Sequence, residues 1–368
     1  MEFRITAKDG KARAGELFTE HGMIETPNFI PVATKGTIKS LSQDILDKME
    51  IQALLCNTYH LFLRPGEKLI ARQGGLHKFM SWSKPLFTDS GGFQVFSLND
   101  NLKIDDEKVI FRSCIDNSQH IFTPERAIQI QHDLGADIIF AFDECLHFDS
   151  DYETVQKSLQ RTHAWAERCL AEHTILGGKQ TLYGVVQGGQ YEDLRRESAK
   201  FIADLGFLGF GLGSIFGKPK QKVYDIINWM MEELPEEKPK HLLGIGAVED
   251  IFNGVELGVD TFDCVLPTRL ARMAYVFTSE GNEITKWRYR VTNNKYREDL
   301  GPLDENCECS VCKRFTRSYI HNLFRNQELL AYSLVTEHNL SFFNQLMKTI
   351  REAIRVGKFK EIKEKWTG

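Results

Sequence analysis

The chain has 368 residues, of which 42% are hydrophobic and 26% charged, enough to bury a full core. A net charge of −5 argues against a protein whose whole surface is built to bind nucleic acid. The N-terminus lacks the basic start and apolar run of a signal peptide, and no stretch approaches the length of a membrane helix. We therefore expect a soluble, cytoplasmic protein with no membrane partner.

Short apolar runs suited to buried parallel strands recur along the chain. The eight runs span residues 28–33, 53–57, 85–89, 137–143, 181–187, 209–213, 241–246 and 260–267. Helical stretches at 124–134, 152–173, 194–205, 220–234 and 248–257 separate several of them. This alternation favours the α/β class and a closed (β/α)8 TIM-type barrel. Residues 3–23, with Asp-Gly in the middle, predict a hairpin that plugs one end.

The strand and helix rhythm stops after residue 267. Between residues 268 and 325 there are 11 Lys and Arg against 7 Asp and Glu, a local charge of +4 that leaves −9 elsewhere. Only that region is suited to a polyanion. The sequence thus predicts a barrel with the hairpin and active site (1–267), a polyanion-contacting and metal-binding subdomain (268–345) and a C-terminal helix (346–368).

Polar side chains follow several of the predicted strands. Asp89, Asp143, Gln187 and Asp263 stand at strand ends, which form the active-site face of a barrel. Any one of these acids is more often only a cap or turn residue, but three acids and an amide at one rim favour a site. Two carboxylates facing one pocket suit chemistry at a sugar carbon, with one as nucleophile and the other as proton carrier.

The cysteines fall into two groups. Five are scattered, whereas Cys307, Cys309 and Cys312 are crowded together, a pattern typical of a reducing compartment with one metal site. With His338 they supply three thiolates and an imidazole, a complete tetrahedral set for one structural zinc ion. His321 is an alternative fourth ligand.

Several motifs together are specific to one family. They are Thr-Asp-Ser-Gly-Gly-Phe-Gln-Val at 88–95, Leu-Gly-Ala-Asp at 134–137, Phe-Asp-Glu-Cys at 142–145, Gly-Val-Val-Gln-Gly-Gly at 184–189, Phe-Asp-Cys-Val-Leu-Pro-Thr-Arg at 262–269 and the Cys-Cys-Cys-His set. Over essentially its whole length the chain resembles the bacterial-type tRNA-guanine transglycosylases, also called queuine tRNA-ribosyltransferases.

The resemblance implies a mechanism and partners. Asp263 would attack C1′ of the wobble nucleotide of tRNA, displace guanine and form a covalent intermediate, which a 7-deazaguanine then resolves to give queuosine modification. Asp89 would be the general acid and base. The implied partners are a tRNA with G at the wobble position, in a U-G-U context, and a second copy of the chain, because Tyr319 matches a dimer-interface position.

The resemblance also implies which residues bind the base and the RNA. Asp143 and Gln187 would read the edge of the base, and Phe93 and Leu243 would sandwich its faces. The full substrate-binding set is Ser90, Gly91, Gly92, Phe93, Asp143, Cys145, Gln187, Gly213 and Leu243. The RNA-binding set is Gly244, Gly246, Thr268, Arg269 and Arg272.

One loop departs from the family pattern. Residues 212–218 read Leu-Gly-Ser-Ile-Phe-Gly-Lys, whereas bacterial members have Gly-Gly-Leu-Ala-Val-Gly-Glu. Lys218 would repel the aminomethyl ammonium of the usual base, preQ1, so we hypothesise that preQ1 is not the substrate and that queuine taken up ready-made is a candidate. Phe216 could instead narrow the pocket.

Two other functions remain open from the residues. A glycoside hydrolase would share the barrel and the acid pair, but it would not need the base-sandwich residues or the zinc set. A non-catalytic tRNA-binding subunit is disfavoured, because both Asp89 and Asp263 are retained in full motifs.

Overall fold

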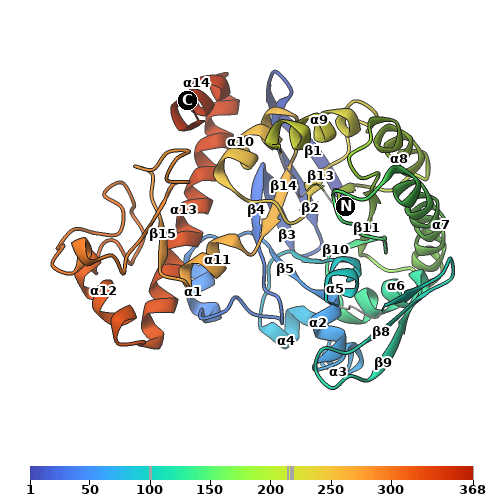
Figure 1. The fold of residues 1–368 in the computed structure, drawn as a ribbon, viewed down its shortest axis with the longest axis horizontal. Helices are drawn as coiled ribbons and strands as arrows, with labels where there is room; N and C mark the ends of the chain where they lie inside the picture. The colour runs from blue at the N-terminus through green and yellow to red at the C-terminus, as the bar shows by residue number, and fades with distance from the viewer. Residues whose placement is uncertain (99–101, 214, 216–218, 368) are drawn as a thin grey trace.

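The computed structural model of the protein describes residues 1–98, 102–213, 215 and 219–367. Eight parallel strands form one sheet in the order β4-β14-β13-β12-β11-β10-β6-β5, and a backbone hydrogen bond of 2.7 Å from Ala33 N to Leu55 O joins its two edges. The strands are β4 (Asn28–Pro31), β5 (Leu54–Cys56), β6 (Leu86–Thr88), β10 (Ile138–Phe140), β11 (Thr181–Val186), β12 (Phe210–Leu212), β13 (Lys240–Leu242) and β14 (Thr261–Cys264). The predicted α/β barrel is confirmed (Figure 1).

The barrel strands are buried on both faces, which explains why they read as continuous apolar runs. Phe87, Ile138 and Val185 belong to a cluster inside the barrel, whereas Leu86, Ile139 and Val186 pack outward. The outer layer contains α6 (Pro124–Leu134), α7 (Tyr152–Leu176), α8 (Glu192–Asp204), α9 (Lys220–Met231) and α10 (Val248–Glu256). These helices agree with the predicted ones to within a few residues.

The predicted N-terminal hairpin is present and has a third strand. The hairpin consists of β1 (Glu2–Asp9) and β2 (Ala12–Thr19), and β3 (Gly22–Thr26) pairs antiparallel with β2 to complete a three-stranded sheet. Gly22 has a φ of 132°, a conformation that permits the second turn. Leu17 and Ile24 of this sheet pack into the interior cluster, so the segment does close one end of the barrel.

The connections between β4 and α6 are more elaborate than the sequence indicated. They contain α1 (Gln43–Lys48), α2 (Thr58–Leu63), α3 (Glu67–Arg72), α4 (Gly75–Met80), α5 (Gly92–Ser97) and a small antiparallel sheet of β7 (Lys103–Ile104), β8 (Val109–Arg112) and β9 (Gln119–Phe122). Phe111 and Phe122 of that sheet pack against Tyr59 and Phe142, so the sheet is anchored to the barrel.

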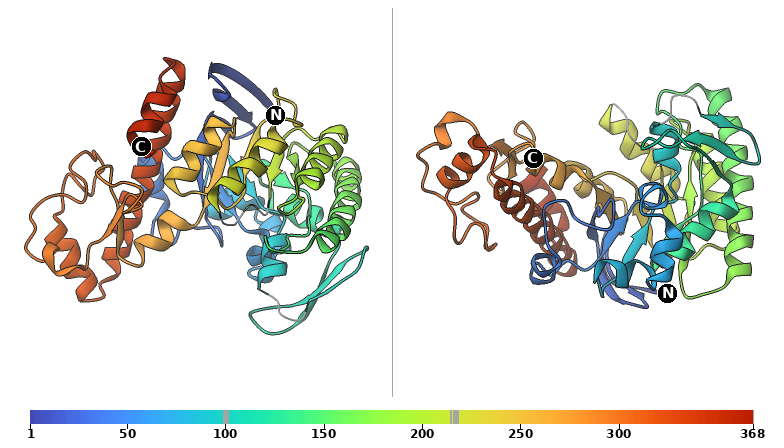
Figure 2. Two further views of the ribbon diagram at one scale, coloured as in Figure 1. Left: turned by 45° about the horizontal axis from the view of Figure 1, so that its top comes forward. Right: turned by 90° about the horizontal axis from the view of Figure 1, so that it is seen from below.

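After β14 the chain leaves the barrel. The strand predicted at 260–267 is too long. Helix α11 (Leu266–Ala271) begins directly after Val265 and carries Pro267 in its first turn. The remaining elements are β15 (Tyr275–Phe277), β16 (Arg288–Arg290), η1 (Asn294–Tyr296), α12 (Arg317–Arg325), α13 (Leu329–Arg355) and α14 (Phe359–Thr367). Figures 1 and 2 show this appendage extending to one side of the barrel.

Helix α13 connects the appendage to the barrel. It runs without a break across residue 345, where the sequence predicted a domain boundary. Near one end, Arg351 donates a hydrogen bond of 2.9 Å to Pro27 O beside the barrel, and His338 and Asn339 lie among the appendage strands. None of the helices in the described ranges combines the length and apolarity needed to cross a membrane.

Candidate active site

A cavity of about 510 Å³ opens at the carboxyl ends of the barrel strands. Most of the predicted site residues line it, namely Asp89, Ser90, Gly91, Phe93, Asp143, Cys145, Gln187, Gly213, Leu243, Gly244, Asp263, Thr268, Arg269 and Arg272. Gly92 and Gly246 lie behind the wall instead. A Cβ at Gly92 would stand 2.6 Å from Asp143 O, and one at Gly246 would stand 2.6 Å from the Cys264 Cβ. These two glycines permit close packing of the segments that form the wall.

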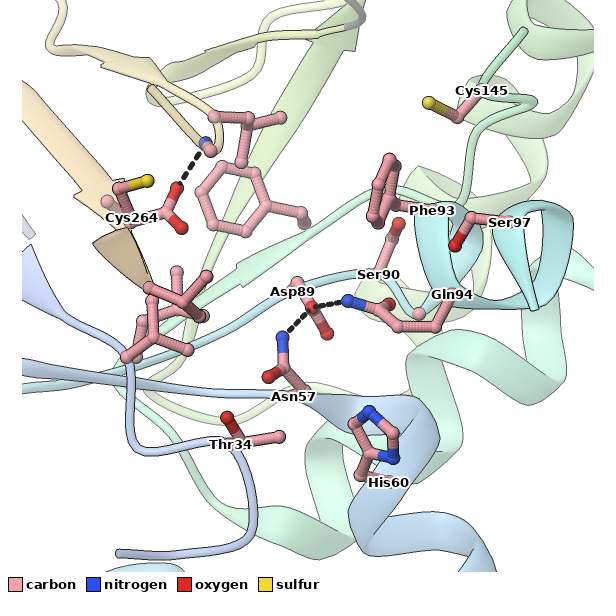
Figure 3. A pocket seen from close by; sticks show the side chains of 18 of the residues that line it. Thr34, Asn57, His60, Asp89, Ser90, Phe93, Gln94, Ser97, Cys145 and Cys264 are labelled. Atoms are coloured by element: carbon pink, nitrogen blue, oxygen red, sulfur yellow. Dashed lines mark hydrogen bonds between the residues drawn. The ribbon is translucent and has the colours of Figure 1, made fainter. Parts of the chain in front are cut away.

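The Asp89 carboxylate, just after β6, is held by three donors. Its Oδ2 accepts hydrogen bonds from Asn57 Nδ2 at 2.5 Å and Gln94 Nε2 at 3.0 Å (Figure 3). Its Oδ1 accepts one from Thr58 N at 2.8 Å. Desolvation raises the pKa of Asp89 to about 6, the three donors oppose that rise, and the nearby charge of Asp263 adds to it. Asp89 can therefore exchange a proton near neutral pH.

The Asp263 carboxylate, on β14, is held through its Oδ1 oxygen. Its Oδ1 accepts a hydrogen bond of 2.8 Å from Gly244 N and lies 3.1 Å from His241 Nε2. In the part of the chain that the structure describes, Oδ2 has no hydrogen-bond partner. The side chain is 8% exposed and lines the cavity. A fixed carboxylate with one unengaged oxygen is suited to nucleophilic attack.

A second wall presents a set of hydrogen-bonded polar groups. Asp143 accepts hydrogen bonds from Ser90 Oγ at 2.9 Å and from Gln187 Nε2 at 2.7 Å, and burial raises its pKa. The Phe93 ring is half exposed and stands beside Ser90 in Figure 3, and Leu243 also lines the cavity. Polar groups for a ring edge and apolar groups for its faces together suit a flat heterocycle.

Arg195, which the sequence gave no reason to select, ties two active-site loops together. It lies on α8 with no exposed surface and donates hydrogen bonds to Gly189 O at 2.7 Å, Gly213 O at 2.9 Å and Val186 O at 3.3 Å. The ends of β11 and β12, which carry Gln187 and Gly213, are thereby fixed relative to each other.

The cavity rim is cationic. Burial lowers the pKa of Lys39, and repulsion from Arg272, Lys35 and Arg269 lowers it further. None of these four side chains pairs with an acid among the residues that the structure describes. Within the described ranges, Arg272 donates a hydrogen bond to Thr268 O alone, at 2.7 Å. Unpaired cations around a cavity attract an anionic chain such as a nucleic-acid backbone.

The appendage contains a four-residue group of metal-type ligands. His338 Nδ1 lies 3.7 Å from Cys307 Sγ, 3.6 Å from Cys309 Sγ and 3.3 Å from Cys312 Sγ. In a tetrahedral zinc site with bonds of about 2.3 Å to sulfur and 2.0–2.1 Å to nitrogen, such atoms stand roughly 3.6 Å apart. His338 Nε2 donates to Phe277 O at 2.8 Å, which leaves Nδ1 free to bind the ion.

The alternative ligand His321 is turned elsewhere, with Nδ1 3.0 Å from Val291 O. The group of Cys307, Cys309, Cys312 and His338 can therefore hold a metal ion, as the sequence predicted, with no open position for a substrate.

A second group, His21, His77 and Asp137, lies at the opposite end of the barrel. His21 Nδ1 is 2.7 Å from the Asp137 carboxylate, and His77 Nε2 is 3.2 Å both from that carboxylate and from Lys84 O. The Nε2–H of His77 is shared between these two acceptors. Hydrogen bonds therefore explain why the three side chains lie together, and no metal ion is needed.

Comparison with known proteins gives one consistent family. The profile of the family described as "Queuine tRNA-ribosyltransferase" matches residues 8–368. Proteins of that name from Thermoanaerobacter pseudethanolicus and Fusobacterium nucleatum are 49% and 48% identical to the chain, covering 100% of it and 96% and 97% of their own lengths. One from Roseiflexus sp. is 45% identical over 100% of the chain and 99% of its own length.

Proposed function

The chain belongs to the queuine tRNA-ribosyltransferase family and is a tRNA-guanine transglycosylase of queuosine biosynthesis, and we propose that Asp263 and Asp89 carry out its reaction. The observation that carries this proposal is the difference between the two carboxylates in one cavity. Among the described residues, Asp263 has one oxygen without a hydrogen-bond partner, whereas both oxygens of Asp89 accept hydrogen bonds and its pKa is raised to about 6.

The reaction proceeds by two displacements at C1′ of the wobble ribose. Asp263 Oδ2 forms a bond to C1′ as the bond to guanine breaks, and protonated Asp89 gives its proton to the leaving base. Asp89 then takes a proton from the incoming 7-deazaguanine, whose nitrogen attacks C1′ and releases the Asp263 carboxylate. Two inversions retain the anomeric configuration.

The second wall binds the base. Asp143 and Gln187 form hydrogen bonds with the edge of the base, together with Ser90 and the Gly213 backbone. Phe93 and Leu243 cover its two faces. Gly91 and Cys145 complete this wall, and Gly92 packs closely behind it. The hydrogen bonds already present between Ser90, Asp143 and Gln187 support this role, because they hold the polar atoms in place before a ligand enters.

The cationic rim binds tRNA. The wobble base must leave the anticodon stack to reach the cavity, so its neighbours lie against the rim. Thr268, Arg269 and Arg272 on or next to α11, with Gly244, would contact the RNA strand around a U-G-U anticodon, and Gly246 would support this surface from behind the cavity wall. We place the reaction in the cytoplasm, and Tyr319, which is 39% exposed, would contribute to a homodimer.

The appendage would hold one zinc ion through Cys307, Cys309, Cys312 and His338. The ion, bound by three thiolates and an imidazole, would stabilise the fold of residues 268–345 and take no part in the displacements. The identity of the incoming base rests on Phe216 and Lys218, which lie outside the described residues. We keep the hypothesis that queuine is preferred to preQ1, and steady-state kinetics that favoured preQ1 would reject it.

Exchange of labelled guanine into tRNA tests the proposed chemistry. The intact protein should incorporate the label, and Asp263→Asn should lower the rate by at least about 10⁴-fold, because the nucleophile is lost. The variant keeps an oxygen that can accept from Gly244 N, so its melting temperature should be unchanged. Exchange at an appreciable rate in Asp263→Asn would contradict the role of Asp263.

A further inference from the structure

We propose that His241 is a positioning residue that fixes one oxygen of Asp263 and favours release of that carboxylate in the second displacement. The inference rests on the proposed function of Asp263 as the nucleophile, and it assigns a distinct task to a side chain that does not line the cavity.

The imidazole of His241 is locked in place. It lies on β13 with no exposed surface, opposite Thr261 in the register of β13 and β14. The ring centroid is 5.5 Å from that of Phe87 and 5.4 Å from that of Phe140. Nε2 lies 3.1 Å from Asp263 Oδ1, and Nδ1 lies 2.9 Å from Thr261 Oγ1. The ring therefore joins the interior of the barrel to the back of the Asp263 carboxylate.

The partners define where the proton lies. An ionised carboxylate only accepts hydrogen bonds, so Nε2 carries the hydrogen that faces Asp263. The hydroxyl of Thr261 can donate to Nδ1, so a neutral imidazole has both nitrogens satisfied. Such an arrangement presents a fixed donor to Asp263 without burying a charge.

The two oxygens of Asp263 consequently have different tasks. His241 Nε2 and Gly244 N both point at Oδ1, which leaves Oδ2 to attack the ribose. In the covalent intermediate the carboxylate is an ester and its charge is lost. As the ester breaks in the second displacement the charge returns, and the two donors stabilise it. In the first displacement the same donors stabilise the starting carboxylate, so they do not accelerate that step.

The test of this inference is whether a change at His241 slows the second displacement and not the first. In His241→Phe the ring still fills the space between Phe87 and Phe140, but the donor is gone. Single-turnover quench-flow experiments should show base incorporation slowed about 10- to 100-fold, the effect of removing one donor from a developing anion. Guanine release should change by less than about three-fold, and the fraction of enzyme covalently bound to tRNA at steady state should rise.

Two further variants make the result specific. In His241→Gln the side-chain amide can place an N–H near the position of Nε2, so incorporation should recover to within a few-fold of the original rate. His163→Phe is the matched control, because His163 is also buried and stacked on a ring, that of Phe201 at 4.2 Å, but lies on α7 away from the cavity. It should leave both steps unchanged.

The outcomes separate this inference from the proposed function. Equal slowing of both steps in His241→Phe, without recovery in His241→Gln, would mean a purely structural role and overturn the inference. Unchanged rates in His241→Phe would do the same while Asp263 kept its role. If the intact protein formed no covalent complex with tRNA, the role of Asp263 would fall, and this inference with it.

Discussion

The cavity and the metal-ligand group of the appendage use polar side chains in opposite ways. In the appendage four ligand atoms face one another, and the remaining nitrogen of His338 is bonded to Phe277 O. In the cavity, Asp263 Oδ2 has no partner in the described part of the chain, and the rim cations have no acid beside them. Polar atoms that all have partners within the protein stabilise its fold, whereas polar atoms without such partners are available to bind a substrate.

After Asp263→Asn, Asp89→Asn should produce the largest effect among variants that spare the metal-ligand group. The loss of the proton carrier should slow exchange by about 10²- to 10⁴-fold. In the intact protein, protonated Asp89 is needed for guanine release and ionised Asp89 for base incorporation.

Since burial raises the pKa of Asp89 to about 6, release should therefore fall and incorporation should rise as the pH increases through about 6. Single-turnover pH profiles measure both steps, and profiles that persisted in Asp89→Asn would assign the proton transfers to another group.

Loss of the metal tests the other region in the comparison, the metal-ligand group of the appendage. Cys309→Ser removes one thiolate, so it should lower the metal content and destabilise the appendage by several kcal/mol. Asn339, next to His338, donates hydrogen bonds of 3.0 Å to Pro267 O on α11 and to Tyr275 O.

In Cys309→Ser we therefore expect the KM for tRNA to rise more than kcat falls, because Arg269 lies on α11 and Arg272 directly follows it. Metal analysis, thermal unfolding and kinetics provide the readouts, and a fall in kcat alone would show that the metal acts on the chemistry.

Asp143→Asn should affect the base and leave the RNA unaffected. Its carboxylate accepts from Ser90 and Gln187, and a neutral amide can no longer accept from every donor that surrounds it. The kcat/KM for the incoming base should fall about 10- to 100-fold, while the Kd for tRNA stays within two-fold. An equal loss of tRNA affinity would mean that Asp143 supports the rim rather than the base.

Arg269→Gln and Arg272→Gln should give the smallest effects. Each should weaken tRNA binding several-fold at low salt and reduce the slope of log K against log salt by about 0.7 to 0.9, the contribution of one phosphate contact. Arg288→Gln, elsewhere in the appendage, provides a comparison. An unchanged slope in both rim variants would place the RNA backbone away from α11.

The sequence was informative where function depends on spacing or on strand ends. Cys307, Cys309 and Cys312 are close in the chain, so their grouping needs no knowledge of the fold. Asp89 and Asp263 were found because parallel strands bring their carboxyl ends to one face of a barrel. Asn57, at the end of a predicted strand, carried the same signal and was missed.

Other contacts required the register of the barrel. His241 reads as one more residue of a buried strand, and only its pairing with Thr261 on β14 places it behind Asp263. Arg195 lies on an outer helix, and nothing in its local sequence indicates that it binds carbonyls of two loops. The third strand of the N-terminal sheet and the unbroken course of α13 across residue 345 depend on packing against the barrel in the same way.

Capture of the covalent intermediate tests the central claim most directly. The protein should be incubated with tRNA, quenched in denaturant and digested, and the modified peptide identified by mass spectrometry. The account predicts a ribonucleotide attached to the peptide that contains Asp263, and no adduct in Asp263→Asn. An adduct on Asp89, or exchange of guanine with no adduct on any residue, would contradict it.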